Sequence, residues 1–221
     1  MQTAKNLELS LVEDFRVTGD GRGAAWAKID WQPLGRVGEG TATYATRFKA
    51  AWSPRGIYLL CDCEDRQLTC SGLPDYGNLF TEDVVELFLW PDERHPLYFE
   101  YEISPLGAQL PILVSNHNGT FHGWLPWHYE GERRCQGATT VRGGERAPGA
   151  AVTGWTVECF IPFALLCGVC PIPKAGDQWR ANVYRIDYDA APCSHWAWDT
   201  RTAANFHDYN RFGAWVFGNA R

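Results

Sequence analysis

Short runs of alternating apolar and polar residues recur along the chain, separated by turns rich in Gly, Pro and Asp. Runs of about four to eight residues with β-branched and aromatic side chains, bounded by such turn residues, are typical of β-strands. We predict strands within residues 44–53, 56–65, 82–92, 97–105, 154–163, 178–188 and 211–218. Helical patterns are scarce, although IPFALLCGVC (161–170) predicts a short helix that begins at Pro162.

This pattern predicts an all-β protein, an antiparallel β-sandwich of immunoglobulin-like or jelly-roll-like type with one or two short helices. The chain has 221 residues, which is long enough to bury a sizeable core. Because sandwiches of this length are commonly single units, we expect one domain over residues 1–221. The sequence contains no phosphate-binding loop, nucleotide fingerprint, heptad pattern or internal repeat.

Because side chains alternate across a strand, each predicted strand has two faces. One face is mainly apolar and contains Val85, Leu87, Leu89, Phe99, Tyr101, Ile103, Trp155, Val157, Cys159 and Ile161. The other mixes carboxylates with aromatic and polar groups: Glu86, Phe88, Trp90, Tyr98, Glu100, Glu102, Ser104, Thr156, Glu158 and Phe160. Within 180–185, Arg180, Asn182 and Tyr184 oppose Ala181, Val183 and Arg185. A mixed face suits a ligand-binding surface or an ordinary half-solvated sheet.

The charge of the chain narrows the classes of partner. A net charge of -6 and a pI near 5.5 argue against nucleic acid and against an anionic membrane surface. No run approaches the roughly 18 apolar residues of a membrane helix. The first fifteen residues lack the apolar core of a signal peptide, which predicts a cytoplasmic protein or a secreted or periplasmic one trimmed of its leader.

Aromatic residues are unusually frequent, with 11 Trp in the chain. They gather in FHGWLPWHYEGER (121–133), which has neither the alternation of a strand nor the spacing of a helix and is interpreted as an irregular loop. Rigid aromatic rings supply flat contact surfaces for ligands. We predict that Trp124, Trp127 and His128 form a lid or side wall of a ligand site, the alternative being a plug over the core.

Eight cysteines are present: Cys61, Cys63, Cys70, Cys135, Cys159, Cys167, Cys170 and Cys193. Their spacing matches neither a small disulfide framework nor a zinc knuckle. We interpret them as buried structural thiols, with one or two disulfides or a metal site as alternatives.

Seven segments in order carry a family resemblance: YLLCDCED, FTEDVVELF, YFEYEISPLGA, GWTVECFIPFALL, WRANVYRID, SHWAWD and FHDYNRFGAWVF. Together they resemble the family 9 carbohydrate-binding modules and the wider DOMON-like sandwich group, over roughly residues 26–217. The resemblance implies an antiparallel sandwich that holds a mono- or disaccharide between two aromatic rings, with polar groups around the hydroxyls.

The resemblance also implies site residues. Phe80 stands where the sugar-binding members carry Trp, and Glu86 is the acid six positions later. We predict stacking on a sugar by Phe80, Trp196 and Trp198, and hydrogen bonds to hydroxyls from Glu86, Glu102, Asn182 and Arg185. Pyranose rings have apolar faces that stack on aromatic rings, and their hydroxyls are read by carboxylate, amide and guanidinium groups.

The same resemblance bears on two cofactors, calcium and haem. Calcium is implied by the family, with Asp62, Glu64 and Asp65 as candidate oxygen ligands. Haem, the other ligand of the DOMON-like group, is disfavoured because its members commonly use a Met ligand and the only Met here is residue 1. The spacing of His117, His122 and His128 matches no standard metal pattern.

The predicted function is therefore binding of a mono- or oligosaccharide, or of the end of a polysaccharide, without turnover. The alternative is a glycan-active enzyme, a glycoside hydrolase or lyase, in which Glu86, Glu102 and His128 act as acid and base. Glu100 and Glu158 widen the choice of carboxylates for that chemistry. A protein-interaction domain is a third class, because aromatic patches also form interfaces. Nucleophilic esterase or protease chemistry has no supporting motif.

Overall fold

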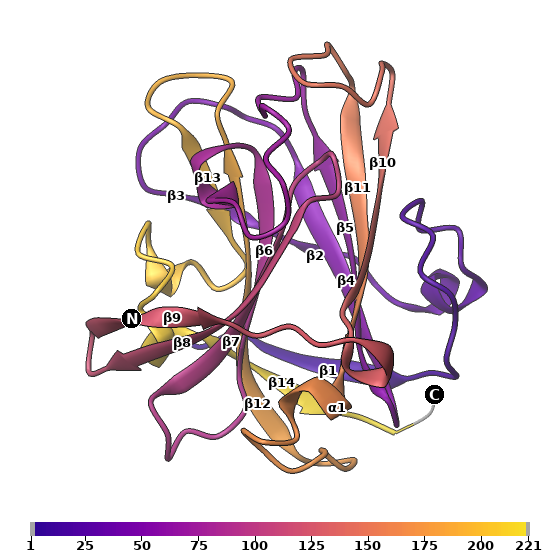
Figure 1. The fold of residues 1–221 in the computed structure, drawn as a ribbon, viewed down its shortest axis with the longest axis vertical. Coiled ribbons are helices and arrows are strands. Elements are labelled where there is room, and N and C mark those ends of the chain that lie inside the picture. Colours follow the sequence, from indigo (N-terminus) through magenta and orange to yellow (C-terminus); the bar gives the residue numbers. More distant parts are fainter. Residues whose placement is uncertain (1–2, 220–221) are drawn as a thin grey trace.

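The computed structural model (Figure 1) describes residues 3–219. Its strands form one continuous hydrogen-bonded path. Its order is β10-β11-β5-β4-β1-β14-β12-β6-β7-β8-β9, with β13, β2 and β3 attached at its sides. The strands are β1 (Asn6–Leu11), β2 (Gln32–Pro33), β3 (Gly35–Val37), β4 (Thr46–Ser53), β5 (Gly56–Glu64), β6 (Val84–Trp90), β7 (Leu97–Ile103), β8 (Gln109–His117), β9 (Thr120–Pro126), β10 (Gln136–Arg142), β11 (Gly154–Pro162), β12 (Gln178–Asp187), β13 (Ser194–Ala197) and β14 (Gly213–Phe217).

The path curls into two packed layers, which confirms the predicted β-sandwich. One layer contains β2, β4, β5, β10 and β11, and the other contains β3, β6–β9 and β12–β14. Strand β1 joins them, because it pairs in parallel with β14 at one end and with β4 at the other. The other strand pairs are antiparallel among the described residues.

Helical structure is short, as the sequence predicts. The α-helix α1 (Phe163–Leu166) follows Pro162, whose extended backbone precedes the first helical residue. The short 3₁₀ helices are η1 (Ala24–Lys28), η2 (Leu79–Thr81), η3 (Gly131–Arg133), η4 (Thr200–Thr202) and η5 (Tyr209–Arg211). Within residues 3–219, no helix combines the length and the apolar character that crossing a bilayer requires.

The apolar faces of both layers meet in one core, and the predicted alternation is confirmed. Val85, Leu87 and Leu89 of β6 pack with Trp155 and Val157 of β11 across this core. Each fully buried large apolar side chain contributes about 1.5–3 kcal/mol to folding. The opposite face of β6 and β7 is therefore free to carry other groups.

That opposite face has its own aromatic cluster. Phe88, Tyr98 and Tyr184 pack there against Phe206 and Phe212 from the segment that contains η4 and η5. The ring centroids of Tyr184 and Phe206 lie 4.0 Å apart in a stacked arrangement. Because this segment covers only part of the face, the carboxylates of β6 and β7 lie beside its edge.

Six of the eight cysteines are buried, which agrees with the prediction of structural thiols. All eight are free; Cys167 is exposed and Cys193 is half-buried. Burial raises the pKa of the Cys63 thiol to about 12 and that of Cys61 well above its usual range. These thiols are therefore poor nucleophiles at neutral pH.

Candidate functional site

A cavity of about 470 Å³ opens on the outer face of β6 and β7. We call it the carboxylate pocket; it is lined by Phe80, Glu86, Glu100, Glu102, Leu110, Ile112, Phe121, Trp124, Ile186, His195, Ala204, Asn205, Phe206 and His207. These residues come from η2, from several strands and from the 204–207 segment, so the pocket exists only in the folded chain.

Three carboxylates form the polar part of this pocket because of strand register. Glu86 of β6 lies directly opposite Glu102 of β7, and Glu100 is two residues away from Glu102 on the same face. Directly opposed residues have Cβ atoms about 4.5–5.5 Å apart. The exposed fractions of Glu86, Glu100 and Glu102 are 2%, 4% and 1%. The pairing thus places three buried acids together.

Burial is the main influence on these acids, and mutual repulsion adds to it. The pKa of Glu102 is raised to about 7 by burial, although hydrogen bonds from Glu100 and from the Phe80 backbone N–H partly oppose the shift. The pKa values of Glu86 and Glu100 are raised well above the usual range by burial and by neighbouring carboxylates. Because a protonated carboxyl can donate to a carboxylate, Glu100 and Glu102 can share a proton.

Three exposed aromatic side chains line the pocket beside the carboxylates. Phe80, Phe121 and Trp124 are 46%, 46% and 41% exposed although they are large and apolar. Phe80 lies in η2, which is anchored by the buried Leu79 and by a 2.8 Å hydrogen bond from Tyr188 Oη to the Phe80 carbonyl. Exposed aromatic rings that converge on one cavity are typical of ligand-contact surfaces.

The segment 120–126, predicted as an irregular loop, is the edge strand β9, and that prediction is wrong. Residues from Thr120 to Pro126 pair with β8, and the pairing register shifts between Ser115 and Asn116 of β8. Residues three apart on a regular strand point to opposite faces. Here Phe121 and Trp124 line the same pocket, because the irregular register and Gly123, with φ +105°, re-aim the strand between them.

The 204–207 segment forms the facing wall. His207 Nδ1 lies 2.7 Å from Tyr98 Oη, and the His207 carbonyl accepts a 3.0 Å hydrogen bond from Asn116 Nδ2. Its ring also contacts Phe121, with centroids 5.1 Å apart. Burial lowers the pKa of His207, which favours the neutral imidazole.

A second histidine, His195 on β13, lines the same pocket. Its ring meets Phe206 edge-on at 5.5 Å, and burial followed by the nearby Arg36 lowers its pKa. Both pocket histidines therefore favour the neutral form at pH 7, and neither provides a lasting positive charge beside the carboxylates.

Four of the ten predicted ligand-binding residues meet in the carboxylate pocket: Phe80, Glu86, Glu102 and Trp124. The structure places the remaining six elsewhere. Trp127 packs against the core, and its Nε1 donates to the Leu165 carbonyl at 3.0 Å. The His128 ring lies against Tyr76, with centroids 4.5 Å apart, beside a separate hollow of about 210 Å³. The triplet Glu86, Glu102 and His128 of the enzyme alternative is therefore not assembled.

The predicted stacking residues Trp196 and Trp198 belong to the core. They are 2% and 1% exposed and pack on the inner face of the layer. Trp196 pairs with Arg185 of β12, whose side chain points to the inner face. Because side chains alternate along the chain, Trp196 and Trp198 point away from the pocket and His195 points toward it. Asn182 is fully buried, where its Nδ2 donates to the Asp199 carbonyl and its Oδ1 accepts from the Asp199 N–H.

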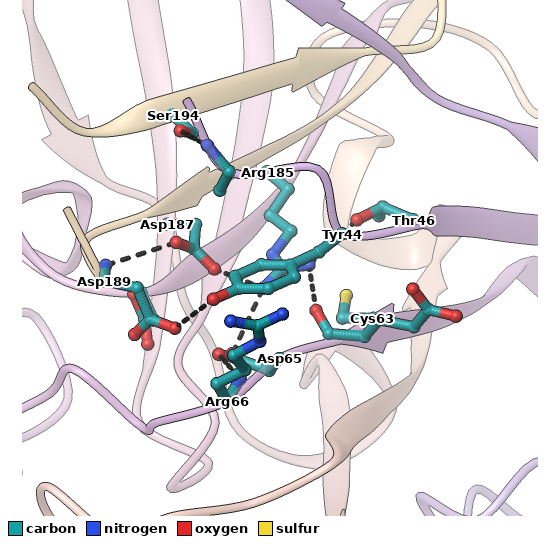
Figure 2. Close-up of polar contacts among 12 residues, drawn as sticks. Tyr44, Thr46, Cys63, Asp65, Arg66, Arg185, Asp187, Asp189 and Ser194 are labelled. Carbon is teal, nitrogen blue, oxygen red and sulfur yellow. Dashed lines mark hydrogen bonds and ion pairs between the residues drawn. The ribbon is translucent and has the colours of Figure 1, made fainter. Parts of the chain in front are cut away.

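Arg185 lies in a buried ion-pair network under the ring of Tyr44 (Figure 2). Its Nη2 contacts Asp187 Oδ2 at 2.6 Å and Asp65 Oδ2 at 3.1 Å, and all three side chains are fully buried. Its Nη1 donates to Thr46 Oγ1 and to the Glu64 carbonyl. Since breaking a buried ion pair costs about 3–5 kcal/mol, Arg185 has a structural role.

The predicted calcium ligands do not form one cluster. Asp62 pairs with Arg47 and Arg142, and Glu64 accepts a hydrogen bond from the Ala45 N–H. Oxygen atoms of Asp65, Asp83 and Asp189 do lie within 4.8 Å of one another.

Each of the six carboxylate oxygens of Asp65, Asp83 and Asp189 already accepts a hydrogen bond. The donors to Asp65 include Trp155 and Arg185, those to Asp83 are backbone N–H groups, and those to Asp189 are the hydroxyls of Tyr44 and Thr69. Oxygen is the right donor type for Ca²⁺, but the described residues satisfy the cluster themselves. Calcium thus stays a prediction of the family resemblance.

Other pocket residues are absent from the predicted site. The sequence places Glu100 on the mixed face that forms the pocket, but names it only as a carboxylate of the enzyme alternative. Four further lining residues are not assigned to the site: Phe121, His195, Phe206 and His207. Alternation carries a usable signal for His195, because it shares parity with the pocket face. Segments without regular alternation give no such signal for Phe206 and His207.

Comparisons with solved structures show the same fold. The chain is similar to a Bacteroides uniformis protein for which carbohydrate binding has been proposed, with 17% identity, a TM-score of 0.79, and coverage of 97% of this chain and 100% of that one. It is also similar to a family 9 carbohydrate-binding module from Caldicellulosiruptor kristjanssonii. The complex of that module with cellotriose gives 16% identity, a TM-score of 0.68, and coverage of 98% and 95%. The complex with glucose gives 17% identity, a TM-score of 0.67, and coverage of 98% and 97%.

No curated protein matches the chain. The model of the family described as carbohydrate family 9 binding domain-like matches residues 17–219, which is most of the sequence. The seven ordered segments, the sandwich and this match agree, and the chain therefore belongs to the carbohydrate family 9 binding domain-like family.

Proposed function

We propose that the chain binds a monosaccharide or the end of an oligosaccharide in the carboxylate pocket, without chemical turnover. One observation carries this proposal: three half-exposed aromatic rings and three buried carboxylates line a single cavity. The rings can stack on the apolar faces of a pyranose, while the carboxylates accept hydrogen bonds from its hydroxyls.

The size and the relatives support the same proposal. A cavity of about 470 Å³ falls within the roughly 300–1,000 Å³ of small-molecule sites. The Caldicellulosiruptor kristjanssonii module forms complexes with cellotriose and with glucose. In this chain, we expect Phe80 and Trp124 to stack on the sugar ring, with Phe121 beside them. Glu86 and Glu102 would accept hydrogen bonds from its hydroxyls.

The proposal is tested by calorimetry with cellotriose and glucose on the wild type and on Trp124→Ala. Removing a ring that stacks on the sugar should weaken binding by about tenfold or more, since the contact is worth roughly 1.5 kcal/mol. Leu125→Ala is the matched control, because Leu125 is the next residue of β9, is 64% exposed and does not line the pocket. Equal affinity of Trp124→Ala and Leu125→Ala would place the sugar elsewhere.

The same mixtures separate binding from catalysis. We expect cellotriose to remain intact over a long incubation, as judged by chromatography of the sugars. Release of shorter sugars that disappears in Glu86→Gln would instead assign the cluster to glycoside hydrolysis.

A further inference from the structure

The carboxylate pocket has an unusual charge inventory. It is lined by Glu86, Glu100 and Glu102, and no Lys or Arg of the described chain lines it. The other titratable groups around the acids are His207 beside Glu100, His195 on β13, and the hydroxyls of Tyr98, Tyr184 and Tyr188. None of these is cationic at neutral pH, so the acids have no internal counter-ion.

Two carboxylate oxygens of this pocket also lack donors. Oε2 of Glu100 and Oε2 of Glu102 are buried, and apart from the proton that these two acids can share, no described N–H or O–H group donates to them. The nearest basic atom is His207 Nδ1, 3.9 Å from Glu100 Oε2, and it is already in contact with Tyr98 Oη. A buried acceptor without a donor is costly, so these two oxygens mark where a ligand donor is missing.

Different ligands would relieve this arrangement to different extents. A sugar hydroxyl donates one hydrogen bond and brings no charge, so a neutral sugar leaves any negative charge of the buried acids unbalanced. A protonated amine donates up to three hydrogen bonds and cancels negative charge. The faces of Phe80, Phe121 and Trp124 attract a cation as well.

We propose that the sugar held in the carboxylate pocket is a 2-amino sugar with a free, protonated amine, and that Glu100 and Glu102 bind this ammonium group. The inference rests on the proposed function, because it specifies which sugar class the same pocket selects. A hexosamine supplies the apolar ring face for the aromatic wall and the cation for the acids in one ligand.

Three β-1,4-linked trisaccharides test this selectivity, because they differ only at C2: the glucosamine trisaccharide, cellotriose and the N-acetylglucosamine trisaccharide. We expect the free amine to bind about tenfold or more tightly than the other two near pH 6.5, as measured by calorimetry on the wild type. Binding of the amine should also release protons from the cluster, which calorimetry in buffers of different ionisation enthalpy detects.

Variants assign the effect to the two acids. Glu102→Gln and Glu100→Gln keep the shape of the side chain but remove its charge, and each should bring the ratio of the amine to cellotriose affinities close to one. Glu93→Gln is the control, because Glu93 is exposed and lies outside the pocket. Since the comparison of trisaccharides uses the wild type, it stands even where a variant folds poorly.

The outcomes distinguish the two proposals. Cellotriose or the acetylated sugar binding as tightly as the amine would overturn the ammonium assignment and leave the proposed sugar binding in place. Failure of all three sugars to bind would overturn the proposed function itself. Tight binding of the amine with an unchanged ratio in both Gln variants would also reject the roles of Glu100 and Glu102.

Discussion

Trp124 and Trp198 are expected to respond to truncation in opposite ways. Trp198 is 1% exposed, and its ring packs near Phe48 and Trp215 at centroid distances of 6.0 and 6.4 Å. Trp198→Ala should therefore lower the free energy of unfolding by about 3–5 kcal/mol. Trp124 is 41% exposed, so Trp124→Ala should change stability by less than about 1 kcal/mol. Urea denaturation measures both.

A milder variant separates a core role of Trp198 from a ligand role. Trp198→Phe keeps an aromatic ring in the core, so the protein should stay folded with unchanged sugar affinity. Loss of affinity in this variant, with the fold intact by circular dichroism, would return Trp198 to the ligand site.

At this scale, alternation is sufficient to place the carboxylates. It predicts Glu86 and Glu102 on a mixed face, and the structure puts both in one pocket. The family resemblance assigns Trp196 and Trp198 to the sugar site from their position in the SHWAWD segment. That assignment does not use the alternation of side chains along the strand. Because alternate residues of β13 and its continuation point to opposite faces, Trp196 and Trp198 lie in the core and His195 lies in the pocket.

The β8–β9 hairpin is the element on which the aromatic wall depends. Gly123 has φ +105°, and a Cβ at this position would meet no atom within 4 Å, so substitution acts on the backbone alone. Gly123→Ala should cost about 1–3 kcal/mol of strain unless the strand relaxes. Relaxation would turn Phe121 or Trp124 out of the pocket and weaken sugar binding, as measured by calorimetry.

Gly131 provides the matched control for this element. It also has a positive φ, +67°, and a Cβ added there would likewise meet nothing within 4 Å, but it lies in η3, away from the pocket. Gly131→Ala should lower the melting temperature without changing sugar affinity. Identical affinities of Gly123→Ala and wild type would show that the wall does not need this backbone conformation.

Regular elements are predictable from the sequence and β9 is not, for a physical reason. A strand shows a period of two only when its two faces meet different surroundings. Six of the seven residues of β9 are exposed, and its pairing contains a register shift, so no alternation marks it as a strand. The buried strands β6, β7 and β11 have regular pairing, and their faces are predicted correctly.

For the molecule as a whole, the order of the segments along the chain predicts the sandwich, since each buried face requires a second layer. The contacts that complete the pocket join residues far apart in sequence: Phe80 in η2, Glu102 in β7, Trp124 in β9 and His207 before β14. Local patterns carry no information about which loops meet above a sheet. The sequence alone therefore does not predict that β9 and the 204–207 segment form the two walls of the pocket.

Buried acids make the stability of the whole molecule depend on pH. Burial is the main cause that raises the pKa of Asp83 to about 8 and that of Glu102 to about 7. Both acids bind their proton more tightly in the folded state, so their contribution to stability is complete below the unfolded pKa near 4 and is lost as pH rises through 7 and 8. The lowered pKa values of His195 and His207 act in the opposite direction, but only below about pH 6.5.

We therefore expect the melting temperature to fall by a few degrees between pH 6.5 and pH 8.5. One pKa unit corresponds to about 1.4 kcal/mol, and 1 kcal/mol shifts the melting temperature of a chain of this size by about 2–4 °C. Glu102→Gln should flatten this decline, because its amide oxygen can still accept the Phe80 N–H while the titrating proton is gone. Glu93→Gln, an exposed change, should keep the wild-type slope. A melting temperature that stays level over this window would mean that the buried acids are already ionised in the folded protein.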